Sequence, residues 1–357
     1  MPHHQCSETM RNFLQELPKC EHHVHLEGTL EPELLFELAK RNNIVLPEQF
    51  PKSKAELTER YNNFADLQDF LDFYYIGTSV LLTEDDFFQL AWNYFERVAK
   101  NDGLAHTEVF FDPQSHTERG VSMDTVVKGF KRGCEKAEEE LGISTKLIMC
   151  LLRHLPSSHG LETINQAEEY IVNGHIHALG LDSAEKPFPP ELFVECYEKV
   201  KQLHGSINLT AHAGEEGDHT YITNSLDLLN VKRIDHGVNS IQSVELLQRL
   251  SDERILLSVC PLSNIKLQVF KELTQIPLLK FLEHDVPFSL NSDDPAYFGG
   301  YILDNYIAIH ENFGFKIEIW EKIVKNSIHG SWCHQSRKDE LLEKLQKVIE
   351  KYSVLLE

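Results

Sequence analysis

Residues 20–28, CEHHVHLEG, form the first of a series of short apolar runs in the chain. Within this run His23 and His25 are two positions apart, and side chains at that spacing point to the same side of a β-strand. Two imidazoles placed in this way can share one metal ion. His22 faces the other side of the strand, so we expect it to be structural. No G-x-G-x-x-G motif follows the run, which argues against a dinucleotide-binding open sheet.

Seven more apolar runs, several of them β-branched, follow at intervals along the chain. They are LAHTEVFFDP (104–113), KLIMCLLRH (146–154), IHALGLDSA (176–184), INLTAHAGEE (207–216), RIDHGVN (233–239), RILLSVCPLSN (254–264) and VPFSLNSDDP (286–295). Amphipathic stretches between most of them, such as 123–141 and 184–203, are long enough for helices that cross back over a sheet. Eight alternating units predict an α/β fold, a closed (β/α)8 TIM barrel, in a single domain of residues 1–357.

Two parts of the chain depart from this alternation. Residues 30–100 contain several helical patterns between the first two strands, and we expect this insertion to help cover one mouth of the barrel. The segment beyond Pro295 is also helical in pattern and ends in KDELLEKLQKVIEKYSVLLE, which has apolar residues at steps of three and four. We expect this tail to pack against the outside of the barrel.

Composition and charge exclude several classes of protein. The chain has 357 residues with 34 Lys and Arg against 56 Asp and Glu, a formal net charge of −22 that repels nucleic acid. No apolar run is long enough to span a bilayer, and the amino terminus does not resemble a signal peptide. The seven cysteines form no C-x-x-C pair, so neither a disulfide framework nor a thiolate zinc site is indicated. We expect a soluble cytoplasmic protein, with the nucleus as an alternative location, and no nucleic-acid or membrane partner.

Polar residues close three further predicted strands. The fifth ends in His212-Ala213-Gly214-Glu215, the sixth in Asp235-His236-Gly237 and the eighth in Asn291-Ser292-Asp293-Asp294-Pro295. A solvated acidic turn would explain the Asp pair, and a hydrogen-bonded core histidine would explain His236. Barrel enzymes carry their chemistry at the carboxyl ends of the strands, however, and four such endings on one rim favour a functional site.

The donor types at this rim indicate a metal centre. Three neutral imidazoles and one carboxylate suit a borderline cation such as Zn²⁺ and leave a position open for water. The expected ligands are His23, His25, His212 and Asp293. A two-metal site of the related hydrolase type often has a bridging lysine at the end of the fourth strand, where this chain has Leu181-Asp182-Ser183. We therefore expect one zinc ion per chain.

These motifs resemble the adenosine/adenine deaminase family of zinc-dependent amidohydrolases. HVHLEG (23–28), HAGEE (212–216), DHG (235–237) and SLNSDDP (289–295) occur in the order and spacing of that family, and the resemblance covers nearly the whole chain. It is strongest to the fungal adenine deaminases, through segments such as LGLDSAEKPFPPELFVECY. The resemblance implies a barrel of the metal-dependent hydrolase type that converts adenine to hypoxanthine and ammonia in purine salvage. The alternatives are an adenosine deaminase and a non-catalytic protein built on the same barrel.

The resemblance also implies roles for single residues. A zinc-activated hydroxide attacks C6 of the purine, and Glu215 protonates N1 as the general acid. His236 orients the hydroxide and stabilises developing charge, and Asp294 forms a hydrogen bond with N7. The P-C-x-x-C signature of cysteine-ligated deaminases is absent.

Two carboxylates bear on whether the substrate carries ribose. Glu27 stands where adenosine deaminases have a shorter Asp, and its extra methylene would reach into the sugar's space. The resemblance also places a glycine of the adenosine deaminases near the purine's N3 edge, at the end of the fourth strand, where this chain has LDSAE with Glu185. We therefore expect Glu185 and Ser183 to contact the N3/N9 edge of free adenine. The alternative is that Glu185 pairs with Lys186 or Arg153 and never touches substrate.

Four residues that close the second and third strands are weaker candidates. They are Asp112, Gln114, Arg153 and His154. Each could line the barrel mouth, or be buried in support of the metal ligands. The sequence leaves the oligomeric state open.

Overall fold

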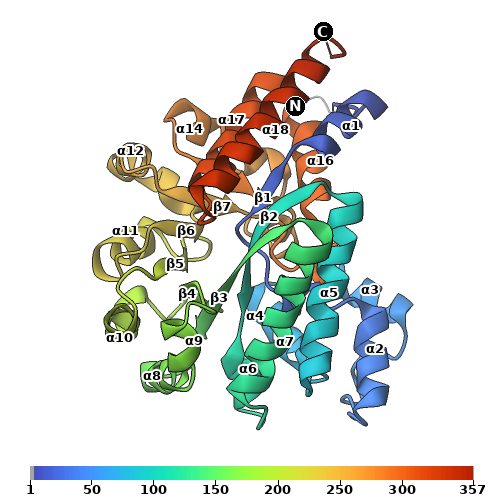
Figure 1. Ribbon diagram of the computed structural model, residues 1–357, viewed down its shortest axis with the longest axis vertical. Coiled ribbons are helices and arrows are strands. Elements are labelled where there is room, and N and C mark those ends of the chain that lie inside the picture. The colour runs from blue at the N-terminus through green and yellow to red at the C-terminus, as the bar shows by residue number, and fades with distance from the viewer. Residues whose placement is uncertain (1–3, 357) are drawn as a thin grey trace.

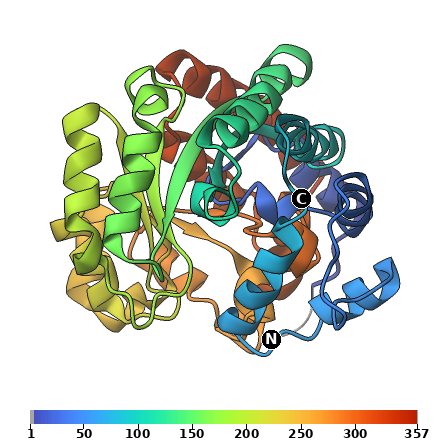
Figure 2. The ribbon, with the colours of Figure 1, turned by 90° about the horizontal axis from the view of Figure 1, so that it is seen from below.

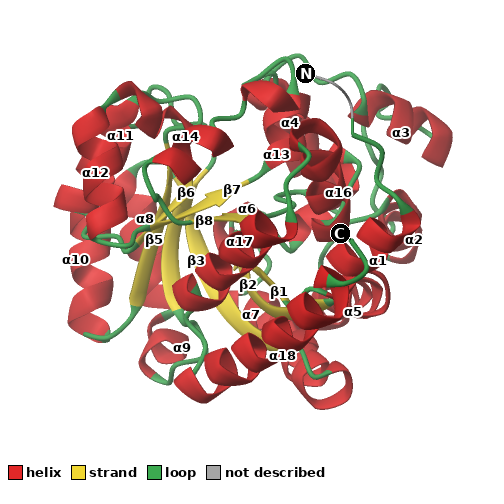
Figure 3. Ribbon diagram, turned by 90° about the horizontal axis from the view of Figure 1, so that it is seen from above, coloured by secondary structure: helices red, strands yellow, loops and turns green. Residues whose placement is uncertain are grey.

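A computed structural model of the protein describes residues 4–356, and its centre is a ring of eight parallel strands surrounded by helices (Figures 1 and 3). The strands neighbour one another in chain order. They are β1 (Lys19–Glu21), β2 (Leu104–Phe111), β3 (Ser144–Leu152), β4 (Ala178–Asp182), β5 (Asn208–Ala213), β6 (Arg233–His236), β7 (Leu256–Val259) and β8 (Phe288–Leu290). Every strand overlaps its predicted apolar run, and the predicted (β/α)8 barrel is confirmed.

The ring closes just beyond the ends of β1 and β8. Val24 and Asp293 form a parallel bridge there. The backbone N–H of His25 donates to the carbonyl of Asp293 at 2.9 Å, and the N–H of Asp293 donates to the carbonyl of His23 at 3.0 Å. On its other side the same segment accepts a bond from the N–H of Phe110 in β2. The H-x-H motif is therefore fixed by backbone bonds on both sides.

The strands are apolar because both of their faces are covered. All eight residues of β2 are buried. Inside the ring Phe110 packs with Ile148, Cys150 and Ala178, whereas its neighbour Val109 belongs to the larger core between the ring and the helices. This alternation along each strand aims every second side chain toward the barrel interior.

The helices that cross back between successive strands form the outer layer. They are α6 (Pro113–Thr117), α7 (Met123–Lys136), α8 (Ser157–Gln166), α9 (Glu168–Val172), α10 (Val194–Leu203), α11 (His219–Leu228), α12 (Val244–Asp252), α13 (Pro261–Lys266) and α14 (Leu278–Glu283). The helix predicted from residue 184 was placed too early. It begins at Val194, after a 3-10 turn, because three prolines in 186–190 disfavour helical backbone in the residues before them.

The insertion between β1 and β2 covers the carboxyl-terminal mouth of the barrel, as predicted. The amino-terminal helix α1 (Glu8–Glu16) precedes β1, and the insertion itself contains α2 (Pro32–Arg41), α3 (Lys54–Tyr61), α4 (Leu67–Thr78) and α5 (Glu84–Asn101). The carboxylate of Asp66 caps α4 by accepting from the N–H of Asp69. The apolar side of α4 faces the pocket at this mouth, and Figure 2 shows the helix lying across the end of the barrel.

The tail after β8 packs on the outside of the barrel, which confirms the second expectation. It comprises α15 (Pro295–Phe298), α16 (Ile302–Phe313), α17 (Ile317–Gly330) and α18 (Gln335–Ser353). Helix α17 lies against β1 and β8, and α18 lies against α17 (Figure 1). Leu341, Leu345 and Val348 of α18 are buried at steps of four and three. No helix between residues 4 and 356 is both long and apolar enough to cross a membrane.

A buried ion pair lies in the barrel interior behind Phe110. Nη2 of Arg233, the first residue of β6, is 2.6 Å from Oε2 of Glu108 in β2. Nε2 of His106 is 3.0 Å from the other oxygen, and the guanidinium stacks 3.7 Å from the ring of Trp332. Burial opposes ionisation of Glu108, but Arg233 and His106 outweigh it and hold the pKa of that carboxyl well below its usual range.

Removing one partner of this pair should destabilise the fold. Arg233→Met leaves Glu108 buried and unpaired, and we expect the free energy of unfolding to fall by about 3–5 kcal/mol. Urea denaturation followed by circular dichroism measures the change. The double variant with Glu108→Leu should recover part of the loss. A single variant that stays within about 1 kcal/mol of the wild type would contradict a structural role for the pair.

Candidate active site

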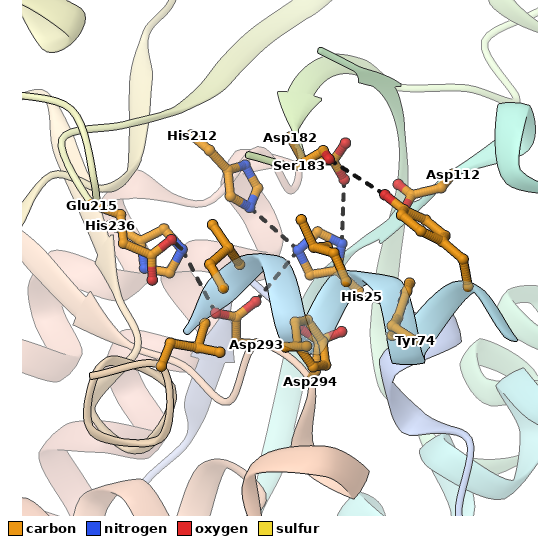
Figure 4. A pocket seen from close by; sticks show the side chains of 15 residues that line it. His25, Tyr74, Asp112, Asp182, Ser183, His212, Glu215, His236, Asp293 and Asp294 are labelled. Atoms are coloured by element: carbon orange, nitrogen blue, oxygen red, sulfur yellow. Dashed lines mark hydrogen bonds and ion pairs between the residues drawn. The ribbon is translucent and has the colours of Figure 1, made fainter. Parts of the chain in front are cut away.

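The predicted metal ligands meet at the carboxyl-terminal rim of the barrel. His23 and His25 follow β1, His212 lies near the end of β5, and Asp293 follows β8. His236, the last residue of β6, joins them from the other side. All five side chains are buried, and Figure 4 shows His25, His212, His236 and Asp293 converging. The structure thus brings together residues that lie up to 270 positions apart, 293 − 23.

The distances between these donor atoms fit one tetrahedral ion. Oδ1 of Asp293 is 3.2 Å from Nε2 of His23 and 3.4 Å from Nε2 of His25. The Nε2 atoms of His25 and His212 are 3.3 Å apart. Four donors at the usual zinc–ligand distances of about 2.0–2.1 Å would stand roughly 3.3 Å from one another in a tetrahedron. The set therefore suits a zinc-like cation.

The imidazoles are oriented by a second layer of oxygen atoms. The three outer contacts are His23 Nδ1 to Ser258 Oγ at 3.0 Å, His25 Nδ1 to Asp182 Oδ2 at 3.5 Å and His212 Nδ1 to Asp235 Oδ2 at 3.5 Å. Ser258 in turn donates to Asp235 at 2.9 Å. Such contacts fix the ring orientation and leave the inner nitrogens free to bind a metal.

Burial keeps two imidazoles of the cluster neutral. Burial, with His23 and His25 nearby, lowers the pKa of His212 well below its usual range, and burial lowers the pKa of His236 to about 3. Both imidazoles are therefore neutral at neutral pH, the form that binds a metal. Burial opposes ionisation of Asp293, but His23 and its other histidine neighbours outweigh it and keep the pKa of that carboxyl low.

Glu215 lies beside the metal ligands and is a suitable proton donor. Its Oε2 is 3.4 Å from Nε2 of His236, and its Oε1 accepts from Nδ2 of Asn264 at 3.2 Å. Burial, and then the charges of Asp293 and Glu185, raise the pKa of Glu215 well above its usual range. Its carboxyl group therefore retains a proton at pH values where an exposed glutamate is ionised.

Unusual backbone conformations aim several side chains into the site. Ser183, His236 and Asp293 have φ values of 71°, 65° and 62°, in the left-handed region that residues with a Cβ atom rarely adopt. Each stands at or just beyond the end of a strand, and strain of this kind is typical of functional sites. Gly28 has a steric role, because a Cβ there would lie 2.0 Å from Oδ1 of Asp294.

The pocket over these residues has an empty volume of about 420 Å³ that is partly open to solvent, with a polar inner side and an aromatic outer side. Its lining is His25, Leu67, Phe70, Leu71, Tyr74, Tyr75, Asp112, Asp182, Ser183, His212, Glu215, His236, Leu267, Asp293 and Asp294. Asp294 and Ser183 therefore stand where a substrate could reach them. The side chains from α4 close the pocket opposite the metal ligands (Figure 4).

Glu185 does not line the pocket, which corrects its predicted contact with the purine edge. It is buried, and its carboxylate accepts from the backbone N–H groups of Gly214 at 3.1 Å, Glu215 at 2.8 Å and Gly217 at 3.0 Å. The alternative pairing with Lys186 or Arg153 is not the observed contact either. Glu185 instead fixes the loop that carries Glu215.

Glu27 also stands behind the pocket wall. Its Oε1 accepts from the N–H of Asp112 at 3.0 Å and from Nε2 of His116 at 2.9 Å. The carboxylate is fully buried and is not part of the lining. The structure therefore differs from the prediction that Glu27 itself reaches into the space of a ribose, because two donors hold it against β2.

Of the weaker candidates, Asp112 lines the pocket and the others have supporting contacts. Gln114 accepts from the N–H of Leu152 at 2.8 Å, and Nη1 of Arg153 donates to the carbonyl of His212 at 2.6 Å. Sequence reasoning missed Tyr74 and Tyr75 of α4 as pocket residues. The aromatic run within LQDFLDFYYIGT is a signal for burial, but it does not say which side of the helix faces the barrel.

Known proteins are similar to this chain over nearly its whole length. The family model described as adenosine deaminase matches residues 18–348. A protein of Candida albicans named adenine deaminase is 61% identical over 354 residues, which make up 99% of this chain and 99% of the relative. The protein of that name from Saccharomyces cerevisiae is 62% identical over 342 residues, 96% of this chain and 98% of the relative.

Solved structures are similar to this chain as well. The crystal structure of adenine deaminase from Arthrobacter aurescens matches with a TM-score of 0.89 at 41% identity, over 94% of this chain and 99% of that chain. An amidohydrolase from Burkholderia ambifaria shares the fold with a TM-score of 0.86 at 22% identity, over 98% of this chain and 96% of that one. This chain belongs to the adenosine deaminase family.

Proposed function

We propose that this protein hydrolyses adenine to hypoxanthine and ammonia, using one zinc ion held by His23, His25, His212 and Asp293. The observation that carries the proposal is the convergence of these donors, three pairs of which lie 3.2–3.4 Å apart, beside the buried Glu215. The substrate is supported by relatives named adenine deaminase that are more than 60% identical over nearly the full chain. Purine salvage in the cytoplasm, or in the nucleus, is the corresponding cellular role.

The residues around the ligands divide the chemistry between them. A zinc ion bound there supplies the Lewis acidity that makes water a nucleophile near neutral pH. His236, whose imidazole is neutral, orients the attacking water toward C6 of the base and stabilises the charge that develops. Glu215 gives its proton to N1 as C6 becomes tetrahedral. Its carboxylate then takes the proton of the hydroxyl group added at C6, which becomes the keto oxygen, and passes that proton to the amine, which leaves as ammonia.

Asp294 completes the contacts to the ring. Burial, and then the neighbouring Asp293, raise the pKa of Asp294 well above its usual range. A carboxyl group that keeps its proton donates a hydrogen bond, which matches the lone pair on N7 of a purine. Ser183 lines the same pocket, and its hydroxyl is 2.7 Å from Nδ1 of His154, so it stands at the rim of the purine site.

The activity is tested by ammonia release from adenine and adenosine offered separately at equal concentration to the zinc-loaded protein. We expect turnover of adenine and little or none of adenosine, because relatives that are more than 60% identical are named adenine deaminase. Turnover of adenosine alone would make the protein an adenosine deaminase. Turnover of neither substrate would reject the proposed reaction.

Removing the proton donor should nearly abolish catalysis. Glu215→Gln keeps the size of the side chain but not its acidic proton, and we expect kcat to fall by about 10³-fold with zinc content unchanged. Glu216→Gln is the matched control, since Glu216 is the next residue and does not line the pocket. Steady-state kinetics and metal analysis measure both effects. A Glu215→Gln enzyme within about tenfold of the wild type would exclude this role.

Activity should also depend on a single metal ion. Dialysis against a zinc chelator is expected to remove activity, and one equivalent of Zn²⁺ per chain should restore it. His212→Ala should lower the zinc content of the purified protein, because it removes one of four donors. Ammonia release and elemental analysis provide the readouts. A metal-free protein that keeps full activity would contradict the proposal.

A further inference from the structure

The wall of the pocket farthest from Glu215 carries a group of polar side chains that the proposed reaction does not use. Asp112 follows β2, Asp182 ends β4, and Tyr74 belongs to α4. In Figure 4 Asp112 and Glu215 lie on opposite sides of the converging ligands. A base with its N1 at Glu215 would therefore present its far edge toward Asp112.

Three buried polar atoms at this wall lack a hydrogen-bond partner within residues 4–356. They are Oδ1 of Asp112, Oδ1 of Asp182 and the hydroxyl of Tyr74. Buried polar groups are nearly always paired, and each exception calls for an explanation. A ligand with a matching hydrogen-bonding edge would provide the missing partners.

The side chain of Asp112 lies close enough to Asp182 to share a proton with it, and its Oδ1 has no other partner within residues 4–356. Asp182 already faces Nδ1 of His25 at 3.5 Å, and the hydroxyl of Ser183 is 2.7 Å from Nδ1 of His154. Asp112 stands at the amino end of α6, yet its side chain makes no capping bond there, although aspartate is a favoured capping residue. Its backbone N–H is held by Glu27 at 3.0 Å, so the side chain is directed from a fixed position.

Free adenine and adenosine differ at one ring atom on the edge opposite C6 and N1. In the free base N9 carries a hydrogen, whereas in the nucleoside it carries the sugar. We propose that Asp112 accepts the N9–H of the free base and is the residue that excludes N9-substituted purines. This inference rests on the proposed function, and it assigns to Asp112 the contact that the sequence had suggested for Glu185.

The protonation of Asp112 supports the assignment. Burial, and then the charges of Asp182 and Glu27, hold the pKa of Asp112 well above its usual range. A carboxyl group that shares its proton with Asp182 still has an oxygen lone pair that can accept the N9–H of adenine. A substituent on N9 would leave the buried carboxyl unpaired, and sites of this kind reject the wrong substrate strongly.

The test compares adenine with 9-methyladenine, which lacks the N9–H and adds only a methyl group. We expect the wild-type kcat/KM for adenine to exceed that for 9-methyladenine by about 10³-fold or more. Asp112→Ala removes the acceptor and opens space, so this ratio should fall by about 100-fold, mainly through loss of activity on adenine. Asp112→Asn keeps an acceptor and a donor, and its ratio should stay within about tenfold of the wild type.

Asp102→Asn provides the matched control. Asp102 is also a buried carboxyl with an unpaired oxygen, and burial raises its pKa to about 6, but it precedes β2 at the opposite end of the strand. For Asp102→Asn, the ratio of kcat/KM for adenine to kcat/KM for 9-methyladenine should equal that of the wild type. Metal analysis of every variant separates a change in specificity from loss of zinc.

Several results would overturn this inference and leave the proposed function intact. One is a wild-type enzyme that uses 9-methyladenine as well as adenine, a measurement that needs no variant. Another is an Asp112→Ala enzyme that keeps the wild-type ratio. A second zinc ion that is bound by the wild type and lost in Asp112→Ala would assign the residue to a metal instead. If the wild type does not deaminate adenine, the proposed function fails and the inference fails with it.

Discussion

Asp293 joins the architecture of the barrel to its chemistry. Its backbone closes the ring through bonds to the residues on either side of Val24. Its Oδ1 is 3.2 Å from Nε2 of His23 and 3.4 Å from Nε2 of His25, and its Oδ2 is 3.6 Å from Nε2 of His236. Because a single residue does both, the closure of the barrel also sets the positions of these histidine side chains, and Asp293 has a left-handed backbone at this point.

Around this centre the protein arranges an unusual density of buried carboxyl groups. Asp293 is ionised by its histidine neighbours, whereas Glu215, Asp294 and Asp112 are pushed toward the protonated form by burial and by one another. Environments that drive similar groups to different protonation states allow one site to hold a cation and to donate protons at the same pH. Glu185 accepts a hydrogen bond from the backbone N–H of Glu215 and so holds this proton donor in place.

The sequence predicted the barrel and the convergence of His23, His25, His212 and Asp293 at one rim, because both follow simple periodic rules. Strand runs alternate with helical stretches, and chemistry gathers where parallel strands end. Prediction from the sequence failed where a contact depends on the direction of a side chain in a loop or helix. Glu185 turned toward backbone amides, Glu27 toward His116, and Tyr74 into the pocket. No local pattern encodes these directions, since they are set by contacts between distant segments.

The central claim, that one zinc ion sits within this set of donors, is tested most directly by anomalous diffraction at the zinc edge from crystals of the purified protein. The account predicts a single strong peak per chain, bounded by His23, His25, His212 and Asp293. Absence of a peak there, or a peak among His25, Asp112 and Asp182 instead, would contradict it.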